Sequence, residues 1–125
     1  MKARILLAAA LLAVAPAAAA ADKDGLFAIH GGRSCWDYLV WKDSDNGVAL
    51  AQVDAWVAGY VTAYNKQTPD TADILGNTSL RSAVQWVEKW CRANPKSNLS
   101  MAMNALTATF HAQRHKTAKE VLKRP

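Results

Sequence analysis

Residues 49–65, ALAQVDAWVAGYVTAYN, form the most regular stretch of this 125-residue chain. Apolar side chains recur there at intervals of three and four residues, at Val53, Trp56, Val57, Tyr60, Val61 and Tyr64. These positions fall on one face of an α-helix, because the helix has about 3.6 residues per turn. The spacing therefore predicts an amphipathic helix at the centre of the fold.

A second helix is predicted over residues 79–94. Ser79 is a candidate N-cap, and Pro95 follows the last residue because proline cannot continue a helix. One line along this helix carries the side chains of Leu80, Val84, Val87 and Cys91. We therefore expect Cys91 to point inward.

Two shorter helices complete the expected architecture. One is predicted over residues 34–42, and the other begins at residue 98 or 100 and carries apolar side chains on one face up to Phe110. No segment alternates polar and apolar residues for long enough to predict a strand. The sequence thus predicts an all-α, small four-helix domain, with residues 66–76 as its longest connection.

The first 21 residues have the composition of a secretory signal peptide. Lys2 and Arg4 precede the apolar run 5–14, and an alanine cluster supplies the small residues that signal peptidase requires. This apolar run is too short to span a bilayer. We expect cleavage between Ala19 and Ala21, and a periplasmic mature protein of residues 22–125.

Cys35 and Cys91 are the only cysteines in the chain. In a small exported protein an even number of cysteines is typical of a disulfide, which here would join the first and third helices. The alternative is two separate thiols. Zinc binding is not expected, because the two cysteines would need further ligands from distant histidines and their spacing fits no zinc pattern.

Charge is distributed unevenly along the mature chain. Residues 22–125 contain 13 Lys and Arg against 10 Asp and Glu, which gives a formal charge of +3. Residues 111–125 hold five of these cations and one glutamate, so the remainder is close to neutral. A neutral body argues against a nucleic-acid partner. We expect a flexible lead-in at residues 22–33 and a solvated basic tail at residues 111–125 that makes no membrane contact.

No pattern in the chain predicts catalysis. The sequence contains no glycine-rich phosphate loop, no nucleophile elbow and no HExxH motif. His111 and His115 are four residues apart and could share a helix face, but two ligands do not make a metal site. We expect a solvated basic helix end there, and a protein with no metal, no cofactor and no enzymatic activity.

The aromatic residues allow two interpretations. Five tryptophans and three tyrosines could simply fill the core of a small bundle. Alternatively some of them form a protein interface, because Trp and Tyr are favoured where one end of a side chain is dry and the other wet. The candidates for contact with a partner are Trp41, Trp86, Trp90, Tyr60 and Tyr64.

Each cysteine lies in a distinctive segment, SCWDYL at residues 34–39 and WCRANPKSNL at residues 90–99. Together these segments resemble the HdeA/HdeB family of periplasmic acid-stress chaperones. The resemblance implies a small helical protein, often dimeric near neutral pH, that loosens in strong acid and holds unfolded periplasmic proteins without ATP. It also implies that Cys35 and Cys91 form the family's disulfide. Protonation of all carboxylates and the three histidines would raise the mature charge from +3 to +16, and such self-repulsion is compatible with this behaviour.

A second resemblance keeps another function open. Gly59 and Tyr60 on the central helix, together with the leader and the helical body, are similar to features of the Tai-type immunity proteins. Those proteins block peptidoglycan-cleaving toxins that are delivered into the periplasm. The resemblance implies a loop that plugs an enzyme cleft, and residues 69–76 would be that loop.

Overall fold

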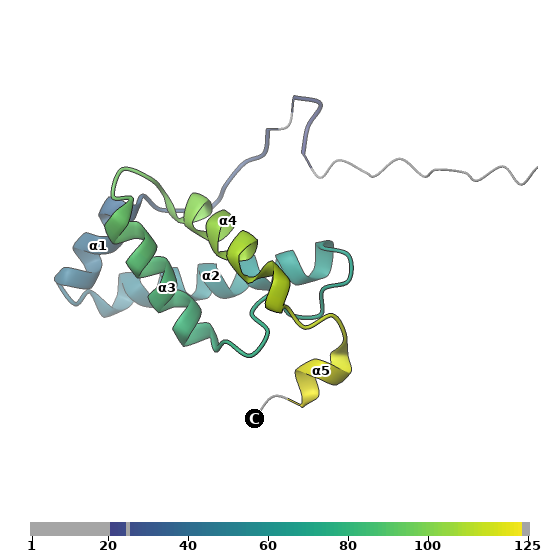
Figure 1. Ribbon diagram of the computed structural model, residues 1–125. Helices are drawn as coiled ribbons and strands as arrows, with labels where there is room; N and C mark the ends of the chain where they lie inside the picture. Colours follow the sequence, from purple (N-terminus) through teal and green to yellow (C-terminus); the bar gives the residue numbers. More distant parts are fainter. Residues whose placement is uncertain (1–20, 25, 124–125) are drawn as a thin grey trace, which may run out of the picture.

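The computed structural model describes residues 21–24 and 26–123, and within them the chain forms a helical bundle (Figure 1). The predicted signal peptide lies outside the described residues except for Ala21. The helices are α1 (Cys35–Asp43), α2 (Gly47–Gln67), α3 (Leu80–Ala93), α4 (Leu99–Phe110) and the short α5 (Ala118–Leu122), with a 3-10 turn, η1 (His111–Gln113), after α4. The described part of the chain contains only isolated bridges and no strand. The predicted all-α fold is confirmed.

Side-chain caps explain where the helices begin. The oxygens of Ser34, Ser79 and Asn98 each accept a hydrogen bond from a backbone N–H in the first turn of α1, α3 and α4. Such bonds satisfy N–H groups that have no partner within the helix. Asn46 does the same for α2, which therefore begins at Gly47, two residues earlier than predicted.

The core lies between the four long helices and also includes Ile74 and Leu75 of the connection before α3. Val53, Val57 and Val61 form the buried line of α2, and Val87 and Cys91 lie on the buried line of α3. The aromatic residues of the predicted α2 stripe are only half-buried and lie at its edge. The expectation that Leu80 shares the centre of the α3 line is wrong, because its side chain is 39% exposed at the beginning of the helix.

A disulfide joins Cys35 at the beginning of α1 to Cys91 near the end of α3. Both residues are fully buried, and their Cα atoms are 5.1 Å apart. The predicted link between the first and third helices is confirmed. Because the bridge spans 56 positions of sequence, restriction of the unfolded chain contributes about 4 kcal/mol in the entropic model.

The basic tail is not a solvated helix end. α4 ends at Phe110, and after η1 the backbone of His115 pairs with that of Asp73, at 2.9 Å and 3.0 Å. The Arg114 guanidinium donates to the Asp70 carbonyl and the Thr71 hydroxyl, both at 3.1 Å. Residues 111–117 therefore form a strap across the connection that precedes α3, and α5 follows the strap.

Gly76 is required by this strap. It has a φ of +57°, and a Cβ at this position would collide with the carbonyl oxygen of Gln113. Glycine is the residue that tolerates both the left-handed backbone and the close approach.

The lead-in is bonded to the bundle from His30 onward. The indole Nε1 of Trp56 donates to the His30 carbonyl at 2.8 Å, and the backbone N–H of Leu99 donates to the Arg33 carbonyl at 2.9 Å. Only the preceding residues present exposed apolar side chains, namely Leu26, Phe27 and Ile29. Contrary to the prediction, the lead-in is therefore anchored over its last part.

Candidate functional site

The five predicted partner-binding residues do not form a single cluster. All are half-buried and pack against the core, but they come from three helices. Tyr60 and Tyr64 belong to α2, Trp41 to α1, and Trp86 and Trp90 to α3. The structure therefore divides the predicted site into separate surfaces.

Trp41 of α1 and Tyr60 of α2 are occupied by contacts within the chain. The Arg33 guanidinium carbon lies 5.7 Å from the Trp41 ring centroid, a cation–π arrangement. The Tyr60 hydroxyl donates to Asn104 Oδ1 at 2.8 Å, and its ring lies 5.7 Å from that of Trp56. These contacts favour a structural role for Trp41 and Tyr60.

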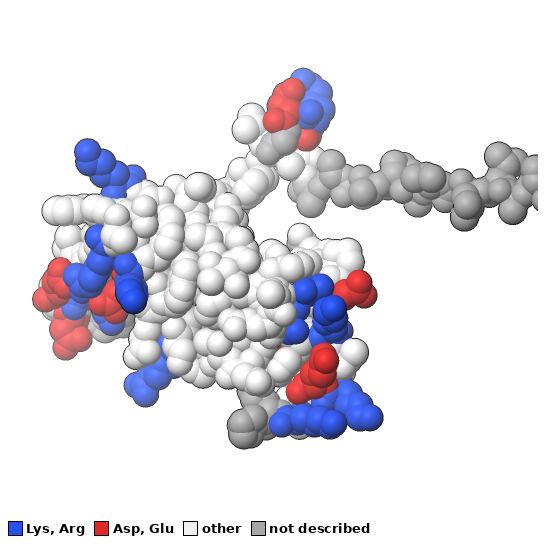
Figure 2. All heavy atoms as spheres, viewed as in Figure 1, with Lys and Arg blue, Asp and Glu red and all other residues white. Residues whose placement is uncertain are grey.

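The surface over α4 and the adjoining part of α3 is uncharged. Figure 2 shows charged side chains gathered mainly at two ends of the visible face, over α1 and around α5, with a broad surface free of charge between them. α4 contains no Lys, Arg, Asp or Glu, and Met101 on it is 51% exposed. Trp86 meets Phe110 at the end of α4 edge to face, with 6.1 Å between ring centroids. Depletion of charge with exposed Met and partly exposed Trp is typical of protein-binding surfaces, and we call this region the α3–α4 face.

Ion pairs hold α1 against α3 beside the disulfide. The Glu88 carboxylate accepts from Lys42 Nζ at 3.1 Å and from Arg92 Nη2 at 2.9 Å. The same Arg92 nitrogen lies 2.9 Å from Asp43 Oδ1. We call these four residues the Glu88 clamp.

The clamp alters the pKa of Glu88. Partial burial acts to raise it, but the hydrogen bonds and charges of Arg92 and Lys42 outweigh burial and hold the pKa below its ordinary value of 4.5. The ionised carboxylate is therefore the form that joins the helices.

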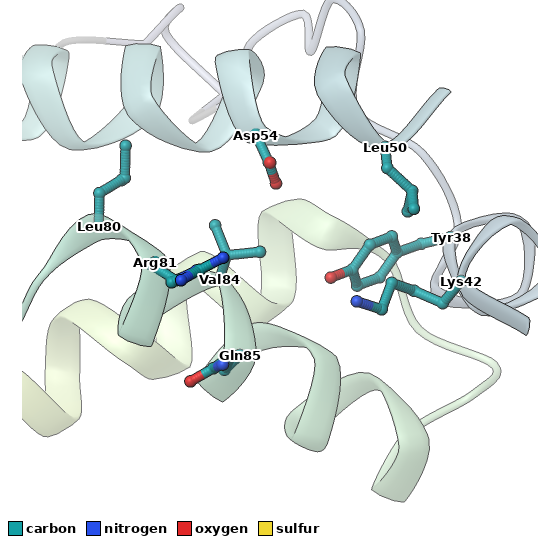
Figure 3. A pocket seen from close by; sticks show the side chains of 8 residues that line it. All are labelled: Tyr38, Lys42, Leu50, Asp54, Leu80, Arg81, Val84 and Gln85. Carbon is teal, nitrogen blue, oxygen red and sulfur yellow. The ribbon is translucent and has the colours of Figure 1, made fainter. Parts of the chain in front are cut away.

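A cleft of about 490 Å³ opens between α1, α2 and α3 (Figure 3). Its polar walls come from three helices, and its apolar wall is formed by Leu50, Leu80 and Val84. Tyr38 is 1% exposed, and its hydroxyl has no hydrogen-bond partner in the described part of the chain. A buried polar group without a partner costs about 1–3 kcal/mol. Burial first, and then the charges of Glu88 and Asp54, raise the pKa of Tyr38 to about 12.

The residues expected from sequence to contact a partner do not include those of this cleft. Tyr38 belongs to the segment 34–39, and two signals in the sequence could have indicated Asp54 and Arg81. Asp54 is the only charged residue in the stretch 49–65. Arg81 lies in the first turn of α3, where the helix dipole disfavours a cation.

Residues 69–76, the loop expected to plug an enzyme cleft under the inhibitor alternative, are largely covered. Within residues 69–76, Thr71, Ile74 and Leu75 are buried, and the strap lies across them. Pro69 and Asp70 are its exposed residues. The loop itself therefore offers no support for the inhibitor alternative.

His111 and His115 do not share a helix face. His111 is exposed in η1, whereas His115 is half-buried and its Nε2 lies 3.1 Å from Asn77 Oδ1. Among the described residues, no group of three or more His, Cys, Asp or Glu could hold a metal ion. None of the helices described has the length and apolar character needed to cross a membrane.

Comparison with known proteins finds no relative. No family model, curated protein or solved structure matches the chain.

Proposed function

We propose that the protein is an exported, periplasmic chaperone that holds unfolded proteins in acid without ATP and without catalysis. The buried disulfide supports an oxidising compartment, where such bonds persist. The composition of the first 21 residues supports export.

The observation that carries the proposal is the Glu88 clamp. One carboxylate binds cations from two helices, and those helices carry half-buried tryptophans beside the core. Protonation of Glu88 removes one of the two negative charges at this junction and leaves Lys42 without its partner, while Asp43 still pairs with Arg92. Acid therefore weakens the contact between α1 and α3, while the disulfide keeps the two helices tethered.

Charge and surface support the same proposal. In strong acid, residues 22–125 reach a formal charge of +16, which favours separation of the helices and keeps a bound client in solution. The α3–α4 face offers an uncharged surface from which apolar contact with a client can begin. Near neutral pH, a second copy of the chain is the proposed occupant of that face.

Light scattering of an acid-sensitive periplasmic protein tests this function. The client is brought to about pH 3 with and without the purified oxidised protein, a pH at which most carboxylates are protonated. We expect the protein to suppress aggregation, and size measurements to show a change in apparent size between pH 7 and pH 3. A compact, unchanged protein that gives no suppression would contradict the proposal.

A pair of variants locates the client surface. Trp86→Ala on the α3–α4 face is expected to reduce the suppression of aggregation. Trp36→Ala is the matched control, because this tryptophan is 65% exposed and belongs to α1 rather than to α3 or α4. Equal suppression by both variants would remove the α3–α4 face from the proposal.

A further inference from the structure

We propose that the cleft between α1, α2 and α3 binds a small zwitterion, an α-amino acid with an apolar side chain or a short apolar peptide. This site is separate from the α3–α4 face and acts near neutral pH. It does not depend on the chaperone proposal.

Two opposite charges line the cleft without a partner. Asp54 comes from α2 and Arg81 from α3, and neither makes a hydrogen bond or ion pair with any described residue. The third charged residue of the wall, Lys42, is already paired with Glu88 at 3.1 Å. One anion and one cation therefore remain available to a ligand.

Tyr38 supplies a third polar contact. Figure 3 shows its hydroxyl directed toward the space between α2 and α3, into which the Asp54 carboxylate also points. This hydroxyl is protonated near neutral pH, as in any tyrosine, and it has no partner within the described residues. Buried polar groups are almost always hydrogen-bonded, so a ligand atom is the natural partner for it.

Access to the hydroxyl requires one side chain to move. The hydroxyl oxygen exposes almost no surface, and Figure 3 shows Lys42 extending beside it. Lys42 is a long side chain that is one-third exposed. We expect it to shift when a ligand enters.

The apolar wall indicates the rest of the ligand. Leu50 and Val84 are half-buried and Leu80 is exposed, so their side chains offer apolar surface to the cleft. The volume of about 490 Å³ is that of an ordinary small-molecule site, since such sites measure about 300–1,000 Å³.

A zwitterion fits these walls better than a ligand with one charge. An anion alone would be repelled by Asp54, and a cation alone by Arg81. A molecule with an ammonium and a carboxylate satisfies both residues, and its apolar side chain can lie against the leucines. Selectivity then comes from repulsion as well as attraction.

Isothermal titration calorimetry at neutral pH with the purified oxidised protein tests the ligand class. The probes are L-leucine, the dipeptide Leu-Leu, leucinamide without the carboxylate, and 4-methylpentanoate without the ammonium. We expect leucine or Leu-Leu to bind, and each single-charge analogue to bind at least about tenfold more weakly, the effect of losing one charged contact. If leucine binds more tightly, the natural ligand is a free amino acid; if Leu-Leu binds more tightly, it is a short peptide. No binding heat from any probe, or equal binding of the single-charge analogues, would overturn the proposal.

Variants of the cleft provide the second test. Asp54→Asn, Arg81→Gln and Tyr38→Phe should each weaken binding several-fold, and Tyr38→Phe keeps the shape of the buried ring. Tyr64→Phe and Lys66→Gln, both near the C-terminal end of α2 and outside the cleft lining, are the matched controls, and both should bind as the unchanged protein does. Circular dichroism establishes that each variant is folded. Unchanged affinity in all three cleft variants would place the ligand elsewhere and overturn the assignment.

Discussion

Tyr60 and Tyr38 differ in whether the side-chain hydroxyl has a hydrogen-bond partner, and this difference should affect stability. The Tyr60 hydroxyl donates to Asn104 at 2.8 Å, whereas the hydroxyl of the more deeply buried Tyr38 has no partner among the described residues. Both rings pack against or within the core. The same chemical change at the two positions should therefore have opposite effects.

Tyr38→Phe is expected to leave the free energy of unfolding unchanged or raise it by about 1 kcal/mol, because it removes a buried donor that has no acceptor. Tyr60→Phe should lower it by about 0.5–1.5 kcal/mol, because a hydrogen bond is lost. Urea unfolding monitored by circular dichroism measures both values. A larger loss for Tyr38→Phe than for Tyr60→Phe would mean that the Tyr38 hydroxyl does have a partner in solution.

Gly76 is the residue on which the strap depends. Gly76→Ala places a Cβ against the Gln113 carbonyl and forces alanine into a backbone conformation with positive φ. We therefore expect the free energy of unfolding to fall by about 1–3 kcal/mol. Gly59→Ala is the control, because Gly59 lies within α2 with open space around it. This variant should raise the free energy of unfolding by about 0.5–1 kcal/mol. Thermal and urea unfolding measure both changes. If Gly76→Ala unfolds like the unchanged protein, the strap does not contribute to stability.

At the scale of elements, local signals predicted the four long helices and their order. Ser34 and Ser79 cap helices at the predicted places, and Asn98, one of the two predicted starts of the last long helix, caps α4. The cysteine pairing also followed from sequence, because only one intramolecular pair is possible. Periodicity and capping depend only on residues that are close in sequence, so they are enough to predict where helices lie.

Features that depend on distant residues were missed. The α2 stripe holds three valines and three aromatic residues, and only packing against the rest of the bundle decides that the valines lie at its centre. The strap depends on Asp70, Thr71 and Asp73 meeting the tail, a contact that leaves no periodic pattern. α5 has only five residues, although its capping box at Thr117 and Glu120 is a signal that could have indicated it.

The Glu88 clamp predicts how the contact between α1 and α3 depends on pH. The pKa of Glu88 is lowered in the folded protein, so the ionised carboxylate stabilises the fold above about pH 4.5. This contribution is lost as the pH falls through the lowered pKa. The free energy of unfolding should therefore decrease in acid more steeply in the unchanged protein than in Glu88→Gln, which lacks the titrating group.

Urea unfolding at a series of pH values between about 3 and 7 measures that slope. Asp70→Asn is the control, because its carboxylate makes no hydrogen bond or ion pair with the described residues and asparagine tolerates its positive φ. The control should keep the slope of the unchanged protein. An equal slope in Glu88→Gln would show that acid acts on the fold through other groups.

The whole molecule combines a tethered junction that contains a titratable carboxylate, Glu88, with a surface free of charge. The disulfide and the Glu88 clamp join the same two helices, but only the clamp responds to pH. Charged side chains lie mainly at the two ends of the visible face, and the α3–α4 face between them is free of charge (Figure 2). This arrangement allows the bundle to loosen at one junction without losing its connectivity.

The central claim is that acid opens the Glu88 clamp and so enables the protein to bind unfolded clients. The most direct test is the pH at which the protein begins to suppress client aggregation. Client light scattering is recorded from pH 7 downward with the unchanged protein and with Glu88→Gln. We predict that both suppress aggregation in acid and that Glu88→Gln begins to do so at a higher pH, because its clamp is already weakened. Suppression at the same pH in both proteins, or none at any pH, would contradict the account.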